Sequence, residues 1–158
     1  MTDARFEDGR ETPLNLGAWE ADDLKIISAL TQDAVFPANA MTWRPEQRRF
    51  GLLLNRFRWE DVEAARKRNR PVERVQSLLV VDQVQSVASN GIDRKDPDLV
   101  LSLLSLDWQA GPDTSGALHL VLAGDGTIRL SVEALEVTLK DVTRPYIAPS
   151  RKVPDHDI

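Results

Sequence analysis

Residues Gly116–Val142 read GALHLVLAGDGTIRLSVEALEVTLKDV, and this stretch decides the fold that we expect. Apolar residues alternate with other residues on both sides of Asp125-Gly126, which is the period-two pattern of β-strands. Asp-Gly favours the positive φ angles that a tight hairpin turn needs. After Val132 the apolar residues move to the opposite parity, which predicts a β-bulge near Glu133 or Ala134 and a bent strand. The stretch therefore predicts two long antiparallel strands in a curved sheet.

The rest of the chain predicts more strands and one packing helix. Residues 21–33 have the apolar spacing of a helix, with Asp22 or Asp23 available to cap its free amides. Residues 60–69 predict a short polar helix or an ordered loop. The strands that we expect are a hairpin (41–44 and 49–59), a strand system with a bulge or bend at Asp82-Gln83 (72–92) and an apolar central strand (99–109). These elements predict an α+β fold: a mainly antiparallel curved meander sheet (a roll or partly open barrel), with the N-terminal helix packed on it. We expect roughly six to eight strands in sequential order.

The domain boundaries follow from periodicity and proline content. Residues 1–20 lack periodicity and predict a mobile N-terminal arm, in which Leu14, Leu16 and Trp19 are available to dock. Residues 21–142 predict a single α+β domain, since 158 residues suit one substantial core. Residues 143–158 contain three prolines and predict a disordered C-terminal tail.

Composition narrows the class of protein. Hydrophobic residues make up 42% and charged residues 28% of the chain, as in ordinary globular proteins. No apolar run is long enough to cross a membrane, and the first residues are acidic and polar, unlike a secretory signal. We therefore expect a cytoplasmic protein without membrane contact. The absence of cysteine excludes disulfides and thiolate chemistry, and we expect no cofactor.

Sequence motifs predict no catalytic or metal site. His119 stands alone in a predicted strand and His156 lies in the predicted tail, so a histidine-based site lacks a positioned partner. The glycines of Gly124-Asp125-Gly126 precede a strand, where a dinucleotide fingerprint would require a helix. The loop aspartates at 93, 96 and 98 lack the spacing of a calcium loop. The catalytic residues thus stay unknown, and we expect no bound metal.

Charge is distributed unevenly along the chain. Between Arg44 and Arg74 there are ten basic and five acidic residues, a net +5, so the remainder of this −5 chain carries −10. We expect Arg56 and Arg58 to project from a strand into solvent near Trp59. The candidate binding residues are Arg56, Arg58, Trp59, Arg66, Lys67, Arg68, Arg70 and Arg74. Pairing with the protein's own carboxylates is the interpretation that we favour over contact with phosphates, because the pI is about 5.1.

Several segments together carry a family resemblance. They are DLKIISALTQDAV, MTWRPEQRRFGLLLNRFRWE, the order VQSVASNGID then VLSLLSLDW, and GTIRLSVEALEVTLKDV. In these segments the chain resembles an uncharacterised bacterial family known as domain of unknown function 2948, over about residues 20–142. The resemblance implies a small cytoplasmic bacterial protein. That family has no assigned activity or catalytic residues to carry over.

Three hypotheses about function remain. The first is a non-catalytic binding or adaptor domain that engages a protein partner through exposed strand edges. The second is weak nucleic-acid or polyanion binding through the Arg56–Arg74 segment. The third is a small-metabolite enzyme that uses carboxylates and arginines, which a buried, convergent cluster of Asp, Glu and Arg would support. We favour a protein that is not an enzyme, and the sequence leaves its oligomeric state open.

Overall fold

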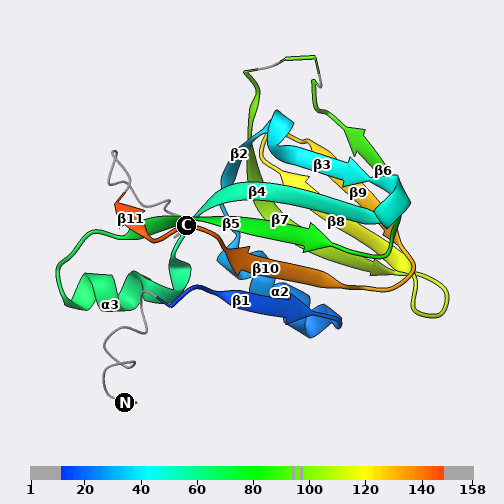
Figure 1. The fold of residues 1–158 in the computed structure, drawn as a ribbon. Coiled ribbons are helices and arrows are strands. Elements are labelled where there is room, and N and C mark those ends of the chain that lie inside the picture. The colour runs from blue at the N-terminus through cyan, green and yellow to red at the C-terminus, as the bar shows by residue number, and fades with distance from the viewer. Residues whose placement is uncertain (1–11, 94, 97, 148–158) are drawn as a thin grey trace.

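The computed structural model describes residues 12–93, 95–96 and 98–147, which form a strand-rich structure with short helices (Figure 1). The strands are β1 (Asn15–Ala18), β2 (Val35–Pro37), β3 (Met41–Arg44), β4 (Arg49–Phe57), β5 (Glu73–Val81), β6 (Val84–Asn90), β7 (Val100–Ala110), β8 (Gly116–Leu122), β9 (Thr127–Val132), β10 (Val137–Asp141) and β11 (Tyr146–Ile147). The α-helices are α2 (Ala21–Leu30) and α3 (Val62–Lys67), and the 3₁₀ turns are η2 (Ala38–Ala40), η3 (Pro45–Gln47) and η4 (Trp59–Asp61).

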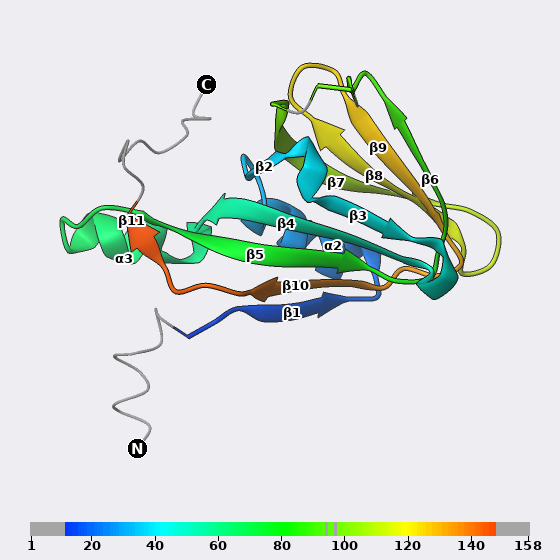
Figure 2. The same ribbon diagram turned by 45° about the horizontal axis from the view of Figure 1, so that its top comes forward.

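All strands belong to one antiparallel sheet that folds over on itself. The order is β1-β10-β5-β4-β2-β7-β8-β9-β6, with β3 also paired to β4 and β11 also paired to β5. Figure 2 shows the two halves of this sheet, one around β4 and β5 and one around β8 and β9, converging near η3. The sheet is open and curved, and the predicted α+β class is confirmed.

The expected strand count and order were partly wrong. The sheet has eleven strands, and sequential order holds only within the meanders β3-β4-β5 and β7-β8-β9. β6 follows β5 in the chain but pairs with β9, and β10 follows β9 but pairs with β5. The chain therefore crosses between the halves of the sheet twice.

Both crossings coincide with the shifts of apolar parity in the sequence. At Gln83 the backbone has a φ of 63°, and β6 continues in the other half of the sheet. The predicted bend at Asp82-Gln83 is thus confirmed. The predicted bulge near Glu133 was wrong, because the strand ends at Val132 and β10 begins in the other half.

The two crossings lie side by side and form what we call the corner (Arg48, 82–84 and 133–136). Glu133 N donates to Gln83 O at 3.0 Å, and Asp82 N donates to Glu136 O at 3.0 Å. A third bond runs from Val84 N to Arg48 O at 2.8 Å. Since these bonds join distant parts of the chain, the corner holds the two halves of the sheet together at one end.

Side chains alternate between inward and outward positions along each strand, and the inward ones form the core between the two halves of the sheet. Most inward positions of β4, β5, β8, β9 and β10 are filled by leucine, valine, isoleucine and phenylalanine with almost no exposed surface. The helix α2 buries Leu24 and Ile27 against this core, while Ile26 stays 56% exposed. Glu20 occupies the N-cap of α2 without a side-chain bond, so the expected caps Asp22 and Asp23 lie in the first turn instead.

The predicted arm and tail each contain a strand. Residues 15–18, expected in the N-terminal arm, form β1, which pairs with β10. Leu14 and Leu16 pack against the core as expected, whereas Trp19 is 62% exposed. In the predicted tail, β11 pairs Tyr146 with Arg74 of β5. Residues 1–11 of the predicted arm and residues 148–158 of the predicted tail lie outside the described residues.

Candidate functional site

The sheet leaves two strands with an open edge near each other. Within the described part of the chain, β3 pairs only with β4, and β6 pairs only with β9. β6 begins at the corner, and β3 ends just before it. The bond from Val84 N to Arg48 O links β6 to the turn that connects β3 with β4. Away from the corner they separate, and a pocket of about 320 Å³ lies between them, which we call the β3–β6 pocket.

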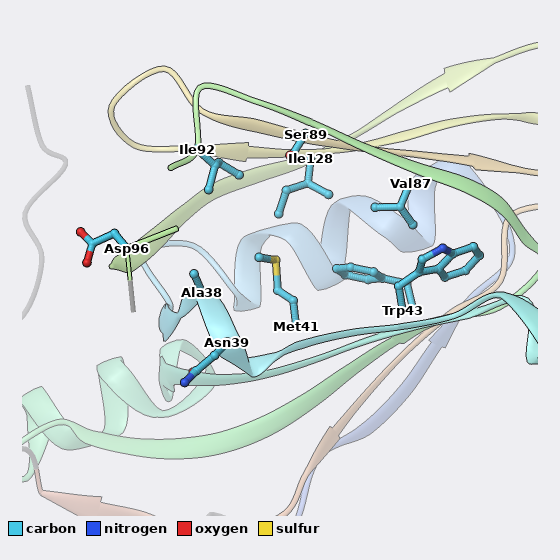
Figure 3. A pocket seen from close by; sticks show the side chains of 10 residues that line it. Ala38, Asn39, Met41, Trp43, Val87, Ser89, Ile92, Asp96 and Ile128 are labelled. Carbon is cyan, nitrogen blue, oxygen red and sulfur yellow. The ribbon is translucent and has the colours of Figure 1, made fainter. Parts of the chain in front are cut away.

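Apolar side chains from both halves of the sheet line this pocket (Figure 3). Its residues are Ala38, Asn39, Met41, Trp43, Phe50, Val87, Ser89, Ile92, Asp96 and Ile128. In Figure 3, Met41 and Trp43 point up from β3 toward Val87 and Ile128, while Asn39 and Asp96 lie at one end. The pocket therefore combines apolar walls with a few polar groups, which is the usual composition of a ligand site.

The strand register indicates which backbone groups of β3 and β6 face the open edges. Along an antiparallel strand, the hydrogen-bonding groups point alternately toward its two neighbours. The bond from Leu122 N to Gly126 O (2.9 Å) shows which residues of β8 and β9 bond to each other. The bond from Asp82 N to Glu136 O does the same for β5 and β10, and the strand registers extend this alternation through β4 to β3. Four residues consequently direct backbone N–H and C=O groups to the open edges: Met41, Trp43, Val87 and Ser89.

Arg56 lies at the other end of β4 and is fully buried, with 0% exposure. The expectation that it projects into solvent was wrong, because it occupies the inward parity of Leu52 and Leu54. Its Nη atoms donate to Glu60 at 2.8 and 2.9 Å and to Asp141 at 3.0 Å. Its Nε donates to Ser77 at 3.0 Å, and its Nη1 also donates to the backbone of residue 57 at 3.0 Å.

We call Arg56, Glu60, Ser77 and Asp141 the Arg56 cluster. Ser77 Oγ donates to Asp141 at 2.6 Å, and Leu14 N donates to the same carboxylate at 2.9 Å. Burial lowers the pKa of Arg56, but the bonds and charges of Glu60 and Asp141 outweigh burial and raise that pKa above its ordinary value. Because all five guanidinium N–H groups are used, the cluster offers a ligand no free donor.

A second ion-pair cluster surrounds Arg58, which is 3% exposed and was also wrongly expected in solvent. Arg58 bonds to Glu73 at 2.8 Å and to Asp61 at 3.4 Å. Arg70 bonds to the same Asp61 at 2.7 Å, and this hydrogen bond raises the pKa of Arg70. The convergent Asp, Glu and Arg that would have supported an enzyme are thus present. They form ion pairs with one another, although the buried Nε of Arg70 has no hydrogen-bond partner among the described residues, and they line no part of the β3–β6 pocket.

The other predicted binding residues have mixed surroundings. Trp59 is half-buried, and its Nε1 donates to Gln32 O at 3.0 Å. The guanidinium of Arg74 covers the Phe57 ring at 4.0 Å, and burial lowers the pKa of Arg74. Three of the set are exposed together on and after α3: Arg66, Lys67 and Arg68. The basic segment is therefore divided between internal ion pairs and a small exposed group.

The β3–β6 pocket was not predicted from the sequence. Met41 and Trp43 were predicted in a strand, and Val87 in a strand system, but nothing local indicates that these strands face each other.

Among the described residues, no group of His, Asp and Glu could hold a metal ion. None of the described helices is long and apolar enough to span a membrane. His119 sits half-buried on β8, in register with Asp107 and Arg129.

Comparison with known proteins assigns a family. No curated protein and no solved structure matches the chain. Residues 14–156 match the family described as protein of unknown function (DUF2948), which agrees with the resemblance in its segments. The match covers the sheet, both α-helices and the β3–β6 pocket. The chain belongs to this family of proteins of unknown function, DUF2948.

Proposed function

We propose that the chain is a binding module that holds an extended, apolar segment of a partner protein in the β3–β6 pocket. The observation that carries this proposal is the pairing of two open strand edges with an apolar pocket between them. An extended peptide added to a sheet edge gains backbone hydrogen bonds, and pockets for its alternate side chains provide specificity.

Backbone and side chains would act together in such a site. Val87 and Ser89 offer N–H and C=O groups at the open edge of β6, and their side chains line the pocket. A segment paired there would direct every second side chain toward Met41, Trp43 and Phe50. The partner chemistry is therefore an extended segment with large apolar residues at alternate positions.

A small apolar molecule is the closest alternative occupant. The pocket volume of about 320 Å³ lies at the lower end of the range for small-ligand sites. Such a molecule would leave the backbone groups of both edges unused, so the peptide is the better match. An enzyme is less favoured, because Arg56 and Arg58 are engaged in ion pairs with neighbouring carboxylates and none of these residues lines the β3–β6 pocket.

Weak polyanion binding remains a second candidate, supported by the exposed residues Arg66, Lys67 and Arg68. A phosphate-binding surface loses affinity steeply as salt increases. A labelled single-stranded oligonucleotide should then bind at low salt and be released at high salt, and the variant Arg66→Glu should weaken it. Absence of low-salt binding would remove this candidate.

The peptide proposal is tested by selecting a random dodecapeptide display library on the immobilised protein. Enriched peptides are expected to carry alternating apolar residues. The substitution Ser89→Pro removes an N–H at the open edge of β6, while the alternate residues keep their bonds to β9. We expect at least about tenfold weaker binding to this variant, as for the loss of a central contact.

The matched control is Ser89→Thr, which keeps the N–H and a hydroxyl and should retain binding. Both variants are first compared by circular dichroism and denaturation to establish that they fold. Equal binding to Ser89→Pro and wild type would contradict the proposal. Thermal stabilisation by dodecanoate, without any enriched peptide, would favour the small apolar ligand.

A further inference from the structure

The half of the sheet around β4 and β5 has a second side, which faces away from the core. We call it the outer face. Its outward positions are Asn15 and Gly17 (β1), Thr42 and Arg44 (β3), Arg49, Gly51, Leu53 and Asn55 (β4), Arg74, Gln76, Leu78 and Val80 (β5), and Thr138 and Lys140 (β10). Within the described residues, α2 packs against β1 and β7, and neither α2 nor α3 packs to a comparable extent on β4, β5 or β10.

The charges on the outer face have one sign. Its cations are Arg44, Arg49, Arg74 and Lys140, and none of its strand positions carries Asp or Glu. Arg49 is neutralised at the rim by Asp82 at 2.8 Å. Ion pairs within the described residues include none with Arg44 or Lys140. A basic surface on a chain of net charge −5 complements an acidic partner.

Apolar groups occupy the centre of the outer face. Leu53 is 39% exposed, and it pairs across the strands with Leu78. Trp19, which is 62% exposed, lies over Gly17 at the β1 end of the same face. Exposed tryptophan and arginine around an aliphatic centre match the composition of protein interfaces.

A notch of about 330 Å³ lies at Gly51, between Leu53, Val80 and Thr42. A Cβ added to Gly51 would meet no atom within 4 Å, so the absence of a side chain here opens the notch to solvent. The neighbouring strands put Val80 on one side of Gly51 and Thr42 on the other. The notch can thus accept one large apolar side chain, with Arg44 at its edge.

We propose that the outer face binds an acidic segment of a protein partner, which inserts one large apolar side chain into the notch at Gly51. This surface is separate from the β3–β6 pocket, since the two share no lining residue. A nucleic acid is the weaker match to the same charges. Its bases stack on aromatic rings, whereas the centre of this face is formed by Leu53, Leu78 and Val80.

The test uses Gly51→Val, whose Cβ would enter the notch without meeting an atom within 4 Å and whose β-branched side chain suits a strand. A random dodecapeptide library is selected on the wild-type protein, and enriched peptides are labelled and titrated against variants by fluorescence anisotropy. One class of peptide should carry Asp or Glu around a large apolar residue. That class should bind Gly51→Val and Lys140→Glu at least about tenfold more weakly, as expected for a central contact.

Ser89→Pro is the matched control, because it changes the β3–β6 pocket and leaves the outer face intact. Acidic peptides that lose binding to Gly51→Val but keep it to Ser89→Pro support the proposal. If no acidic class is enriched, or if Gly51→Val binds it like wild type, the proposal is overturned. Preferential binding of a single-stranded oligonucleotide that Lys140→Glu abolishes would also overturn it, in favour of a nucleic-acid surface.

Discussion

The two ends of β4 show how one strand serves two purposes. Its inward residues run from Phe50, which lines the β3–β6 pocket, to Arg56, which lies in the enclosed ion-pair cluster. At the first end, apolar side chains and unpaired strand edges face open space. At the other end, every donor of the guanidinium is bonded inside the protein. We infer that the Arg56 end stabilises the fold and that the pocket end is available for binding.

The largest expected effect comes from removing the charge at the enclosed end. Arg56→Met leaves the buried Asp141 without its cation, so the free energy of unfolding should fall by about 3–5 kcal/mol. The matched control is Arg66→Met on the exposed part of α3, which should change it by less than about 0.5 kcal/mol. Urea denaturation measures both, and similar values for the two variants would contradict the distinction between buried and exposed arginines.

A smaller loss is expected when a single hydroxyl of the Arg56 cluster is removed. Ser77→Ala deletes the acceptor of Arg56 Nε and a donor to Asp141, so it leaves one buried group unsatisfied. The free energy of unfolding should decrease by about 1–3 kcal/mol. Combined with Arg56→Met, it should cost less than the sum of the two single losses, because both act on the same cluster. Strict additivity in denaturation experiments would argue against a connected cluster.

At the pocket end of β4, a substitution should change binding and leave stability almost unaffected. Val87→Leu adds one methylene into open space, so the free energy of unfolding should change by no more than about 0.5 kcal/mol. Peptides selected for the β3–β6 pocket should nevertheless bind more weakly, because the added group occupies their volume. Denaturation and anisotropy titration check the two statements separately. A large loss of stability with unchanged binding would show that Val87 serves the core.

The smallest expected effect concerns pH at the corner. The hydrogen bonds from Arg48 and Gln85 lower the pKa of Glu133 below its ordinary value of 4.5. A carboxylate with a lower pKa in the folded state stabilises that state above the unfolded pKa, and this contribution is lost as pH falls through the folded value. Below pH 4.5, wild type should therefore lose slightly more stability than Glu133→Gln. Parallel pH profiles would show that the pair does not hold the corner.

The alternation of side chains along β4 indicates on which face of the strand Arg56 lies. The residues at 50, 52, 54 and 56 share one parity, which predicts one common face. We expected Arg56 to continue this face into solvent, but charged side chains can stay buried when they have partners. Its partners lie far along the chain, Ser77 on β5 and Asp141 on β10. The inward position was therefore readable, whereas the compensation that permits it was not.

The parity shifts near Asp82 and Glu133 were informative in the same limited way. They predicted that the sheet bends, and the structure has its corner at both places. They did not indicate that the chain changes from one half of the sheet to the other. A bulge and a crossing produce the same local slip in apolar alternation, because both turn the next side chain to the opposite face.

By itself the sequence determined the long strands, the packing helix, the curved α+β sheet and the absence of cysteine chemistry. These features follow from the spacing of apolar residues and from turn residues, which act over a few neighbours. Only the tertiary structure decided which arginines are buried, that β3 and β6 present open edges to one pocket, and that the charged strand residues on one face of the sheet are all basic. Each of these depends on strand pairing between distant segments, and local sequence does not specify which distant segment will pair.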